Sequence, residues 1–364
     1  MNCESKKYRR IVVKIGSNVL TREDGRPDTT RISALVDQLA RLHRAGTEFI
    51  LVSSGAVASG RSLLETRVGR IDTVSARQLF SAVGQVKLLN RYYDLFNEYG
   101  IACGQVLTTK ESLSTRRQYL NQRNCMEAML AAGVVPIVNE NDTISVTELM
   151  FTDNDELSGL ISAMMDSETL VILSNIDGIY NGAPGQADSK VIPEIHPGQE
   201  LSQYIQSGKS SFGRGGMLTK CNIARKVADE GIEVIIANGR RDNILTDLIL
   251  TDRDVVCTRF EAAPRPASGV KKWIASSEGF AKGALHLDAG AAAAVSQSKA
   301  ASILAVGVTA VEGDFERDDI VRILSPEGAP LGVGRISCDS ATARRNLGRK
   351  GLKPLIHCDY LYLE

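Results

Sequence analysis

The sequence lacks the features that would direct the chain to a membrane or to nucleic acid. Its 43 basic and 43 acidic side chains cancel, so no net charge attracts it to a phosphate backbone or an anionic lipid surface. No apolar run is long enough to span a bilayer, and the polar segment 1–10 contains no signal-peptide core. We therefore expect a cytoplasmic protein that acts on a small molecule.

Recognisable metal, disulfide and common nucleotide motifs are also missing. Seven dispersed cysteines form no CxxC pair, and the four histidines lie far apart, so neither zinc nor a disulfide framework is predicted. A Walker-type P-loop needs a glycine five positions before its Gly-Lys; for Gly208-Lys209 that position is Gln203. No glycine-rich turn with a later acidic partner follows the first strand, which excludes the dinucleotide fingerprint.

What the chain does have is a repeated alternation of apolar strands with amphipathic helices. It predicts a doubly wound, mainly parallel sheet with helices on both faces. Asp28 is expected to cap the first long helix, and glycines separate helices from the strands that follow them. The predicted strands are Ile11–Ile15, Glu48–Val52, Ile101–Leu107, Val134–Val138, Thr169–Leu173 and Glu233–Ala237.

A length of 364 residues indicates about two domains. Prolines in the segment 261–270 cannot continue a helix or a central strand, so we expect a linker there. The predicted domains are an α/β domain over 1–260 and a small β-rich domain over 271–364. Within the second, the predicted strands are Ser302–Val311, Ile320–Leu324 and Gly332–Ile336.

Polar residues gather where the predicted parallel strands end, which is where such sheets bind ligands. Lys14 interrupts an apolar strand and needs an anion unless it lies on an edge strand and reaches water. Ser54 follows the second strand and can bind a carboxylate, or it can serve as an ordinary helix cap. The run Asn139–Asp142 follows the fourth strand and offers amide and carboxylate groups to a ligand.

A second polar run, Asp153-Asn154-Asp155, comes shortly after it. Its carboxylates could orient lysines or lie near a phosphate-bound metal; the alternative is an Asx-rich loop with a helix cap at Asp153. Ser174 and Asn175 follow the fifth strand, where a nucleotide could lie over a turn.

The glycine-rich turn Phe212–Lys220 is the strongest single signal. Its glycines can turn several backbone N–H groups toward one anion, and the helix that begins near Met217 adds the positive end of its dipole. Lys220 adds a full positive charge, so the turn is interpreted as a phosphate cradle.

Taken together, these motifs resemble the amino-acid kinase family. The segments that carry the resemblance are Val13–Ser17, Ser53–Ala56, Val138–Asp142, Asp153–Asp155 and Gly215–Lys220. Three C-terminal segments, Gly283–Ala294, Gly307-Val308 and Val311–Phe315, resemble a PUA domain. The Asn-Glu-Asn-Asp run and this second domain resemble those found in the branch of the family that phosphorylates L-glutamate.

The resemblance implies transfer of a phosphoryl group from ATP to the side-chain carboxylate of L-glutamate, the first step toward proline. It implies that Lys14, Lys220 and Asp155 are catalytic, and that Ser54, Asp142 and Asn154 bind glutamate. Mg²⁺ is expected on the ATP phosphates near Asp153 or Asp155, with no residue assigned as a direct ligand. Nucleotide contacts are expected from Lys14, Ser174, Asn175, Arg214, Gly215, Gly216, Met217, Leu218, Thr219 and Lys220.

The resemblance also implies feedback inhibition by proline and a homo-oligomer, either a dimer or a tetramer. Two positions depart from the family pattern: Asn175 stands where an aspartate is usual, and Arg214 where a small hydroxyl residue is common. One alternative is a related kinase with another acceptor, such as aspartate or carbamate. The other is a non-catalytic protein that binds RNA through a basic C-terminal cluster: Arg344, Arg345, Arg349, Lys350 and Lys353.

Overall fold

The structure is a computed structural model of the full chain. It describes residues 8–64, 71–113, 116–145, 151, 153–182, 189–199, 217–251, 253–264, 274, 281–297 and 301–363. The chain divides into two compact units. The first comprises Met1–Lys110 and Asn121–Pro266, and the second comprises Ala267–Glu364 with Glu111–Leu120.

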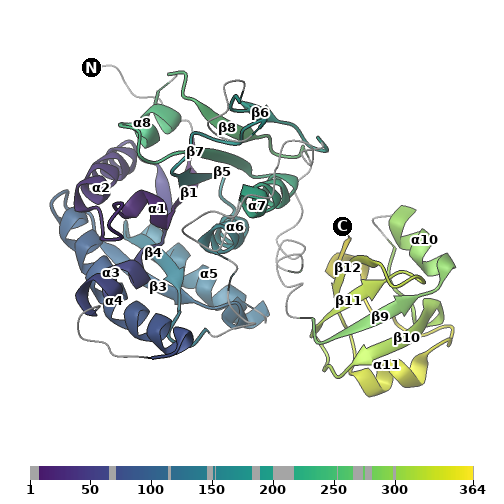
Figure 1. The fold of residues 1–364 in the computed structure, drawn as a ribbon. Helices are drawn as coiled ribbons and strands as arrows, with labels where there is room; N and C mark the ends of the chain where they lie inside the picture. The colour runs from purple at the N-terminus through teal and green to yellow at the C-terminus, as the bar shows by residue number, and fades with distance from the viewer. Residues whose placement is uncertain are drawn as a thin grey trace. The chain divides into compact units, whose positions relative to one another are not determined.

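The first unit is built on an eight-stranded sheet with the order β3-β4-β2-β1-β5-β7-β8-β6 (Figure 1). All pairs from β3 to β7 are parallel; β8 joins antiparallel to β7, and β6 runs parallel to β8. The strands are β1 (Arg10–Ile15), β2 (Glu48–Ser53), β3 (Cys103–Thr108), β4 (Val135–Glu140), β5 (Thr169–Ser174), β6 (Glu194–Ile195), β7 (Glu233–Asn238) and β8 (Cys257–Phe260).

Helices cover both faces of this sheet, as Figure 1 shows. They are α1 (Ser17–Leu20), α2 (Thr29–Arg44), α3 (Ala56–Leu64), α4 (Thr73–Asn97), α5 (Arg116–Ala131), α6 (Asn154–Met164), α7 (Met217–Asp229) and α8 (Ile244–Ile249). The short 3-10 turn η1 spans Glu111–Leu113. Asp28 caps α2 as predicted, because its carboxylate accepts the Arg31 N–H at 3.0 Å.

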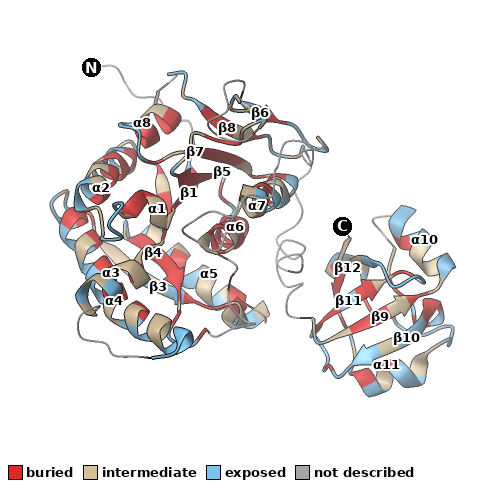
Figure 2. Cartoon of the chain, in the orientation of Figure 1, coloured by how far each residue is buried: buried red, intermediate tan, exposed pale blue. Residues whose placement is uncertain are grey.

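The alternation of side chains along β1 decides what each face of the sheet contains. Ile11, Val13 and Ile15 are fully buried in the core shared with α2, α4 and α8. Lys14 lies between them in sequence, so its side chain points to the opposite face. There α6 packs on β1 and its neighbours (Figure 2). Since β1 is a central strand, the edge-strand alternative for Lys14 is wrong.

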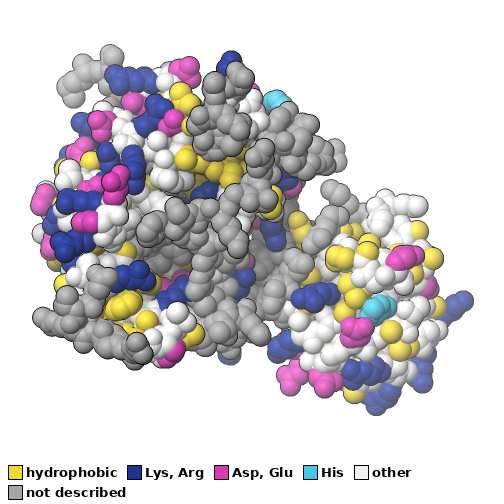
Figure 3. Space-filling view, in the orientation of Figure 1, with side chains coloured by type: hydrophobic (Ala, Val, Ile, Leu, Met, Phe, Trp, Pro, Cys, Tyr) yellow, Lys and Arg dark blue, Asp and Glu magenta, His cyan; other side chains and the backbone are white. Residues whose placement is uncertain are grey.

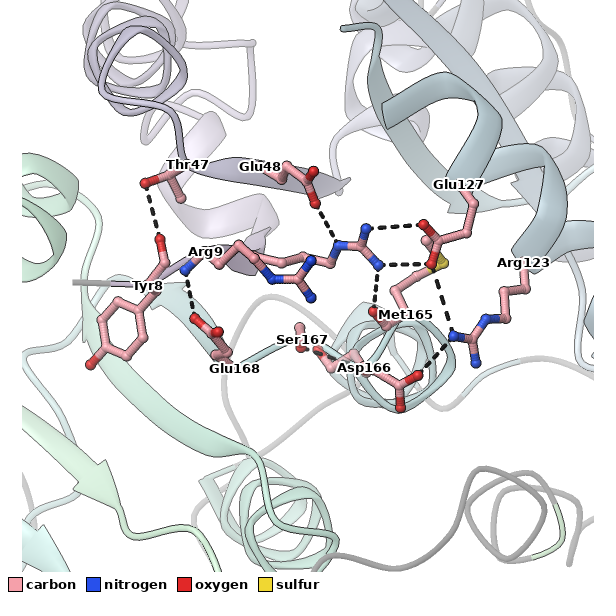
Figure 4. A network of polar contacts seen from close by, with 12 residues as sticks. Tyr8, Arg9, Thr47, Glu48, Arg123, Glu127, Met165, Asp166, Ser167 and Glu168 are labelled. Carbon is pink, nitrogen blue, oxygen red and sulfur yellow. Dashed lines mark hydrogen bonds and ion pairs between the residues drawn. The ribbon is translucent and has the colours of Figure 1, made fainter. Parts of the chain in front are cut away.

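A polar network fixes the other end of β1 (Figure 4). The buried Arg10 guanidinium donates to Glu48 at 2.8 Å, to Glu127 at 2.8 and 3.0 Å, and to the Met165 carbonyl at 2.9 Å. These partners belong to β2, to α5 and to the residue that ends α6. The network therefore ties two helices and a neighbouring strand to the start of β1.

The second unit contains a five-stranded sheet with the order β10-β9-β11-β12-β13. The strands are β9 (Gly283–Leu287), β10 (Val308–Gly313), β11 (Ile320–Leu324), β12 (Pro330–Arg335) and β13 (Leu361–Leu363). All pairs are antiparallel except β9 with β11. Its core includes Leu285, Phe315 and Ile336, and the helices are α10 (Ala289–Gln297) and α11 (Ser340–Asn346).

The predicted fold class is confirmed: a mainly parallel, doubly wound sheet and a small β-rich unit. Each of the six strands predicted for the first unit is present, with ends that differ by at most two residues. The strand predicted over Ser302–Val311 is wrong in its first half. There a 3-10 turn, η4 (Ala305–Gly307), precedes β10, so the buried apolar residues mark a turn against the core.

Surface charges are mixed on the face drawn in Figure 3, where basic and acidic side chains intersperse over both units. Within the described part of the chain, no helix is long and apolar enough to cross a membrane.

Candidate active site

Two lysines and one aspartate form a buried ionic group beside the carboxyl end of β1, named here the lysine cluster. Asp155 lies in the first turn of α6 and is completely buried. One of its carboxylate oxygens pairs with Lys14 Nζ, and the other lies 2.8 Å from Lys220 Nζ in the first turn of α7. Strand β1 and two helices thus meet at a single carboxylate.

The charges in this cluster stabilise one another. Burial disfavours the ionised form of Asp155, but the ammonium groups of Lys14 and Lys220 outweigh it and hold the pKa of this carboxyl below its usual range. Burial likewise opposes the charge on Lys220, but its contact with Asp155 raises the pKa of that amine. Two ammonium groups that share one carboxylate leave the cluster with one surplus positive charge, which suits an anionic ligand.

Asp153 begins α6 and performs the capping role that the sequence left open for it. Its Oδ1 accepts the N–H groups of Asp155 at 2.9 Å and Glu156 at 3.2 Å. Its Oδ2 is buried and has no hydrogen-bond partner within the described residues. Burial and the neighbouring Asp155 charge raise the pKa of Asp153. One uncommitted carboxylate oxygen therefore lies next to the lysine cluster.

A second group, named here the amide network, is centred on Asn154, the residue directly before Asp155. Asn154 Nδ2 donates to Asn139 Oδ1 at 2.9 Å and to Ser54 Oγ at 3.1 Å, with the Ser53 carbonyl at 3.3 Å. Asn139 Oδ1 also accepts the Glu140 N–H at 2.9 Å. The members Ser54, Asn139 and Asn154 come from the ends of β2 and β4 and from the start of α6.

A backbone turn positions Ser54 in this network. Gly55 has φ +104°, a conformation that residues with a side chain rarely adopt, and α3 begins at the next residue. The Ser54 N–H donates to the Ile15 carbonyl at 3.1 Å, so the turn is tied to the end of β1.

Asp142 is held by helix α4 and forms no hydrogen bond with Ser54 or Asn154. It forms an ion pair with Arg77 and accepts the Ser81 hydroxyl at 3.2 Å. Arg77 also lies 3.6 Å from Glu140, and burial raises the pKa of that carboxyl. The structure therefore brings two of the three predicted glutamate-binding residues into direct contact and joins the third to them through the run Asn139–Asp142.

The predicted nucleotide residues are more dispersed. Ser174 is buried at the end of β5, 3.5 Å from the exposed Asn175 amide oxygen. The residues from Met217 to Lys220 form the first turn of α7. The other five residues of the predicted cradle, from Phe212 to Gly216, lie outside the described residues, and they include the predicted nucleotide contacts Arg214, Gly215 and Gly216.

Four residues of α4 that the sequence motifs do not include support these groups: Arg77, Ser81, Gln85 and Tyr92, named here the α4 stripe. Asn139 Nδ2 donates to Gln85 Oε1 at 2.8 Å, and the hydroxyls of Tyr92 and Ser53 lie 2.8 Å apart. A signal was available in the sequence, because three polar residues at intervals of four share one face of a helix.

The C-terminal basic cluster includes arginines that are already engaged. Arg344 lies 3.3 Å from Asp314 and also donates to the Gly313 carbonyl, and Arg345 donates to Thr342 at 3.0 Å. A cluster with internal partners gives no specific support to the RNA-binding alternative.

Comparison with known proteins adds independent information. Residues 9–238 match the model of the amino acid kinase family, and residues 283–355 match that of the PUA domain. The chain is 65% identical to a glutamate 5-kinase of Bacteroides thetaiotaomicron over 357 residues, covering 98% of this chain and 99% of the relative. It is 48% identical to a glutamate 5-kinase of Chlorobaculum tepidum, covering 98% of each.

Solved structures support the fold alone. A carbamate kinase from Giardia lamblia bound to AMP-PNP aligns with a TM-score of 0.51 at 15% identity, over 71% of this chain and 99% of that one. A UMP kinase from Bacillus anthracis aligns with a TM-score of 0.50 at 16% identity, over 70% of this chain and 96% of that one.

Proposed function

The chain belongs to the amino acid kinase family and to its glutamate 5-kinase branch, and on that premise we propose how its residues perform the reaction. ATP phosphorylates the side-chain carboxylate of L-glutamate, which gives L-glutamyl 5-phosphate and ADP in the first step of proline biosynthesis. One carboxylate oxygen of glutamate forms the new bond to the γ-phosphorus, and the bond from that phosphorus to the oxygen bridging to ADP breaks. The proposal concerns which side chains hold the two reactants and stabilise this transfer.

Lys14 and Lys220 neutralise the charge on the transferred phosphoryl group. The observation that carries this role is the lysine cluster itself, with two buried ammonium groups and one carboxylate. A carboxylate nucleophile is already ionised near pH 7, so the transfer needs positioning and charge stabilisation and no general base. Asp155, held ionised by the two lysines, orients their ammonium groups toward the phosphates.

Ser54, Asn154 and Asp142 bind glutamate. Asn154 uses its Nδ2 group within the amide network, and its Oδ1 accepts no hydrogen bond from a described residue. That oxygen suits the ammonium group of an amino acid, and the Ser54 hydroxyl suits a carboxylate. The negative charge of Asp142 favours the same ammonium group.

ATP lies across Lys14, the Ser174-Asn175 pair and the residues 214–220. The start of α7 supports this placement, since a helix N-terminus favours phosphate and its first turn carries Lys220. Mg²⁺ fits beside these phosphates, because the buried Asp153 Oδ2 is a hard oxygen donor without a hydrogen-bond partner in the described chain. When bound, the ion would supply further charge neutralisation on ATP.

We propose domain limits at 1–260, 261–270 and 271–364, a cytoplasmic location, inhibition by proline, and a homo-oligomer that is a dimer or a tetramer. An apolar row on α4 supports the last: Leu79, Val86 and Tyr93 recur at intervals of seven and are 38%, 61% and 56% exposed. Rows of this kind are typical of surfaces that pack against another helix.

The reaction is tested by ADP release from purified protein with MgATP, with L-glutamate, L-aspartate or no acceptor. Hydroxylamine in the assay traps an acyl phosphate as a hydroxamate. We expect glutamate-dependent ADP and an equal amount of γ-glutamyl hydroxamate. Faster turnover with aspartate than with glutamate would overturn the assignment of the acceptor.

A further inference from the structure

The α4 stripe places polar side chains where the helix would ordinarily bury apolar ones. The stripe members Ser81 and Gln85 are 3% and 8% exposed and lie on the same helical side as the buried Leu88, Leu95 and Phe96. A buried polar group lowers stability unless it is hydrogen-bonded. Each stripe residue has such a partner. Arg77 and Ser81 bind Asp142, which is itself proposed to bind glutamate. Tyr92 contacts Ser53, the residue before Ser54, and Gln85 accepts from Asn139, which in turn accepts from Asn154.

Helix α4 is rigidly placed relative to this site. A Cβ on Gly84 would lie 1.8 Å from the Ala56 carbonyl oxygen, and one on Gly60 would lie 1.8 Å from the Phe80 carbonyl oxygen. Helices α3 and α4 therefore cross in backbone contact. Because α3 begins directly after Ser54-Gly55, this crossing fixes Gln85, the residue after Gly84, relative to the amide network.

Backbone groups determine which way the amides of this network point. The Glu140 N–H can only donate, so the atom of Asn139 that faces it is the oxygen Oδ1. The Asn139 Nδ2 group then faces Gln85 Oε1. The Ser53 carbonyl can only accept, which turns the Nδ2 group of Asn154 toward it and leaves Asn154 Oδ1 on the other side.

We propose that Gln85 is a positioning residue for the glutamate site: by accepting from Asn139 it holds the amide network in the orientation that leaves Asn154 Oδ1 for the ammonium group of glutamate. The inference rests on the proposed assignment of Ser54 and Asn154 to glutamate. Gln85 acts through Asn139 and contacts neither reactant. Without Gln85 Oε1 the buried Nδ2 group of Asn139 loses its acceptor, and the amide network can relax by rotation of the Asn139 side chain.

Three variants test this role by steady-state kinetics. Gln85→Met keeps the length of the side chain and removes the acceptor; Gln85→Glu keeps an accepting oxygen. Gln38→Met is the matched control, since Gln38 is a buried glutamine on α2 that donates to the Ala34 carbonyl and accepts the Leu245 N–H.

In the full-length protein, Gln85→Met is expected to raise the KM for glutamate about tenfold, with the KM for MgATP unchanged within about twofold. Gln85→Glu should stay within about threefold of the parent, and Gln38→Met should match the parent.

Two results would overturn the inference. One is a glutamate KM that stays at the parent value in Gln85→Met. The other is an equal rise in the KM for both substrates in both Gln85→Met and Gln38→Met, which would indicate that the loss of any buried glutamine loosens the fold. Asn154→Ala, measured in parallel, separates the proposed glutamate site from the proposed role of Gln85. An unchanged glutamate KM in Asn154→Ala would disprove the glutamate site itself. A raised KM in Asn154→Ala with none in Gln85→Met would remove only the role of Gln85.

Discussion

Asn154 and Asp155 are consecutive residues in the first turn of one helix, yet they belong to groups held together by different forces. Asp155 joins the lysine cluster, where full charges are buried together and one carboxylate serves two ammonium groups. Asn154 joins the amide network, where neutral groups are aligned by backbone atoms and by α4. The helix start thus separates a charged half of the site from a neutral half.

If the proposed roles hold, the two halves should contribute differently to catalysis. Fixed charges next to a transferred phosphoryl group act most strongly when charge redistributes in the transition state, so they govern kcat. A neutral network that positions an amino acid acts equally before and during transfer, so it governs KM. Substitutions in each half should therefore separate these two constants.

The largest effect is expected for Lys220→Ala. Loss of one ammonium group of the lysine cluster should lower kcat by about 10³-fold, because it would remove the electrostatic stabilisation proposed for the transferred phosphoryl group. Asp155 keeps Lys14 as a partner, so the fold should persist. Turnover and far-UV circular dichroism measure the two effects.

The control is Lys226→Ala, which changes an exposed lysine in the last turn of the same helix. It should leave kcat at the parent value. A folded Lys220→Ala protein with normal turnover would disprove the role of the lysine cluster.

Asp142→Asn should act on the KM for glutamate rather than on kcat. The substitution keeps the shape of the side chain and removes the charge that pairs with Arg77 and is proposed to favour the glutamate ammonium group. We expect the KM for glutamate to rise about 30-fold, the effect of roughly 2 kcal/mol, with kcat changed far less. Initial rates at saturating MgATP measure both constants.

Asp247→Asn is the comparison here, because Asp247 on α8 pairs with Arg253, 3.4 Å away. It should leave the glutamate KM unchanged. If Asp142→Asn lowered kcat alone, the proposed role of Asp142 in binding glutamate would be wrong.

Sequence patterns predict the sheet well because they depend on local properties. Apolar runs of strand length mark each strand from β1 to β7 except the two-residue β6, and Lys14 is conspicuous because a lysine within such a run needs an anion. The second unit is harder, since short segments such as Ala305–Gly307 are buried without being strands. Burial there reflects packing against a core, which a local pattern does not contain.

The pairing within the site depends on three-dimensional information. Sequence alone leaves open whether Asp153 or Asp155 orients the lysines; the structure assigns the cap to Asp153 and the ion pairs to Asp155, because the second residue of α6 faces β1. The α4 stripe has a visible spacing, but polar residues on a helix ordinarily mark a solvent-exposed face. Only the crossing of α3 and α4 at Gly60 and Gly84 shows that this face is buried.

The pH dependence of stability should also distinguish the charged half from the neutral half. Burial opposes ionisation of Asp155, but Lys14 and Lys220 lower its pKa from 3.8 in the unfolded chain to about 2. Its contribution to the free energy of unfolding is therefore complete above pH 3.8 and is lost as the pH falls toward 2. The loss should be on the order of 2 kcal/mol.

Urea unfolding of the parent and of Asp155→Asn at decreasing pH measures this contribution. The parent should lose stability relative to the variant on the acidic side, whereas Asn154→Ala should follow the parent because it removes no titrating group. Parallel curves for the parent and Asp155→Asn would contradict the assigned ion pairs.

The smallest effect is expected for Tyr92→Phe, which removes one hydroxyl at the edge of the neutral half. Tyr92 is fully buried, its hydroxyl lies 2.8 Å from Ser53 Oγ, and Ser53 Oγ also lies 3.0 Å from the Ser54 carbonyl. Burial raises the pKa of Tyr92 to about 12, so the phenol stays neutral and the contact is an ordinary hydrogen bond. Its loss should lower the free energy of unfolding by about 1 kcal/mol, measured by urea titration, and raise the glutamate KM by about threefold with kcat unchanged. A fall in kcat that exceeded the change in KM would mean that the neutral network also acts on the transition state, and the two halves of the site would no longer be separable.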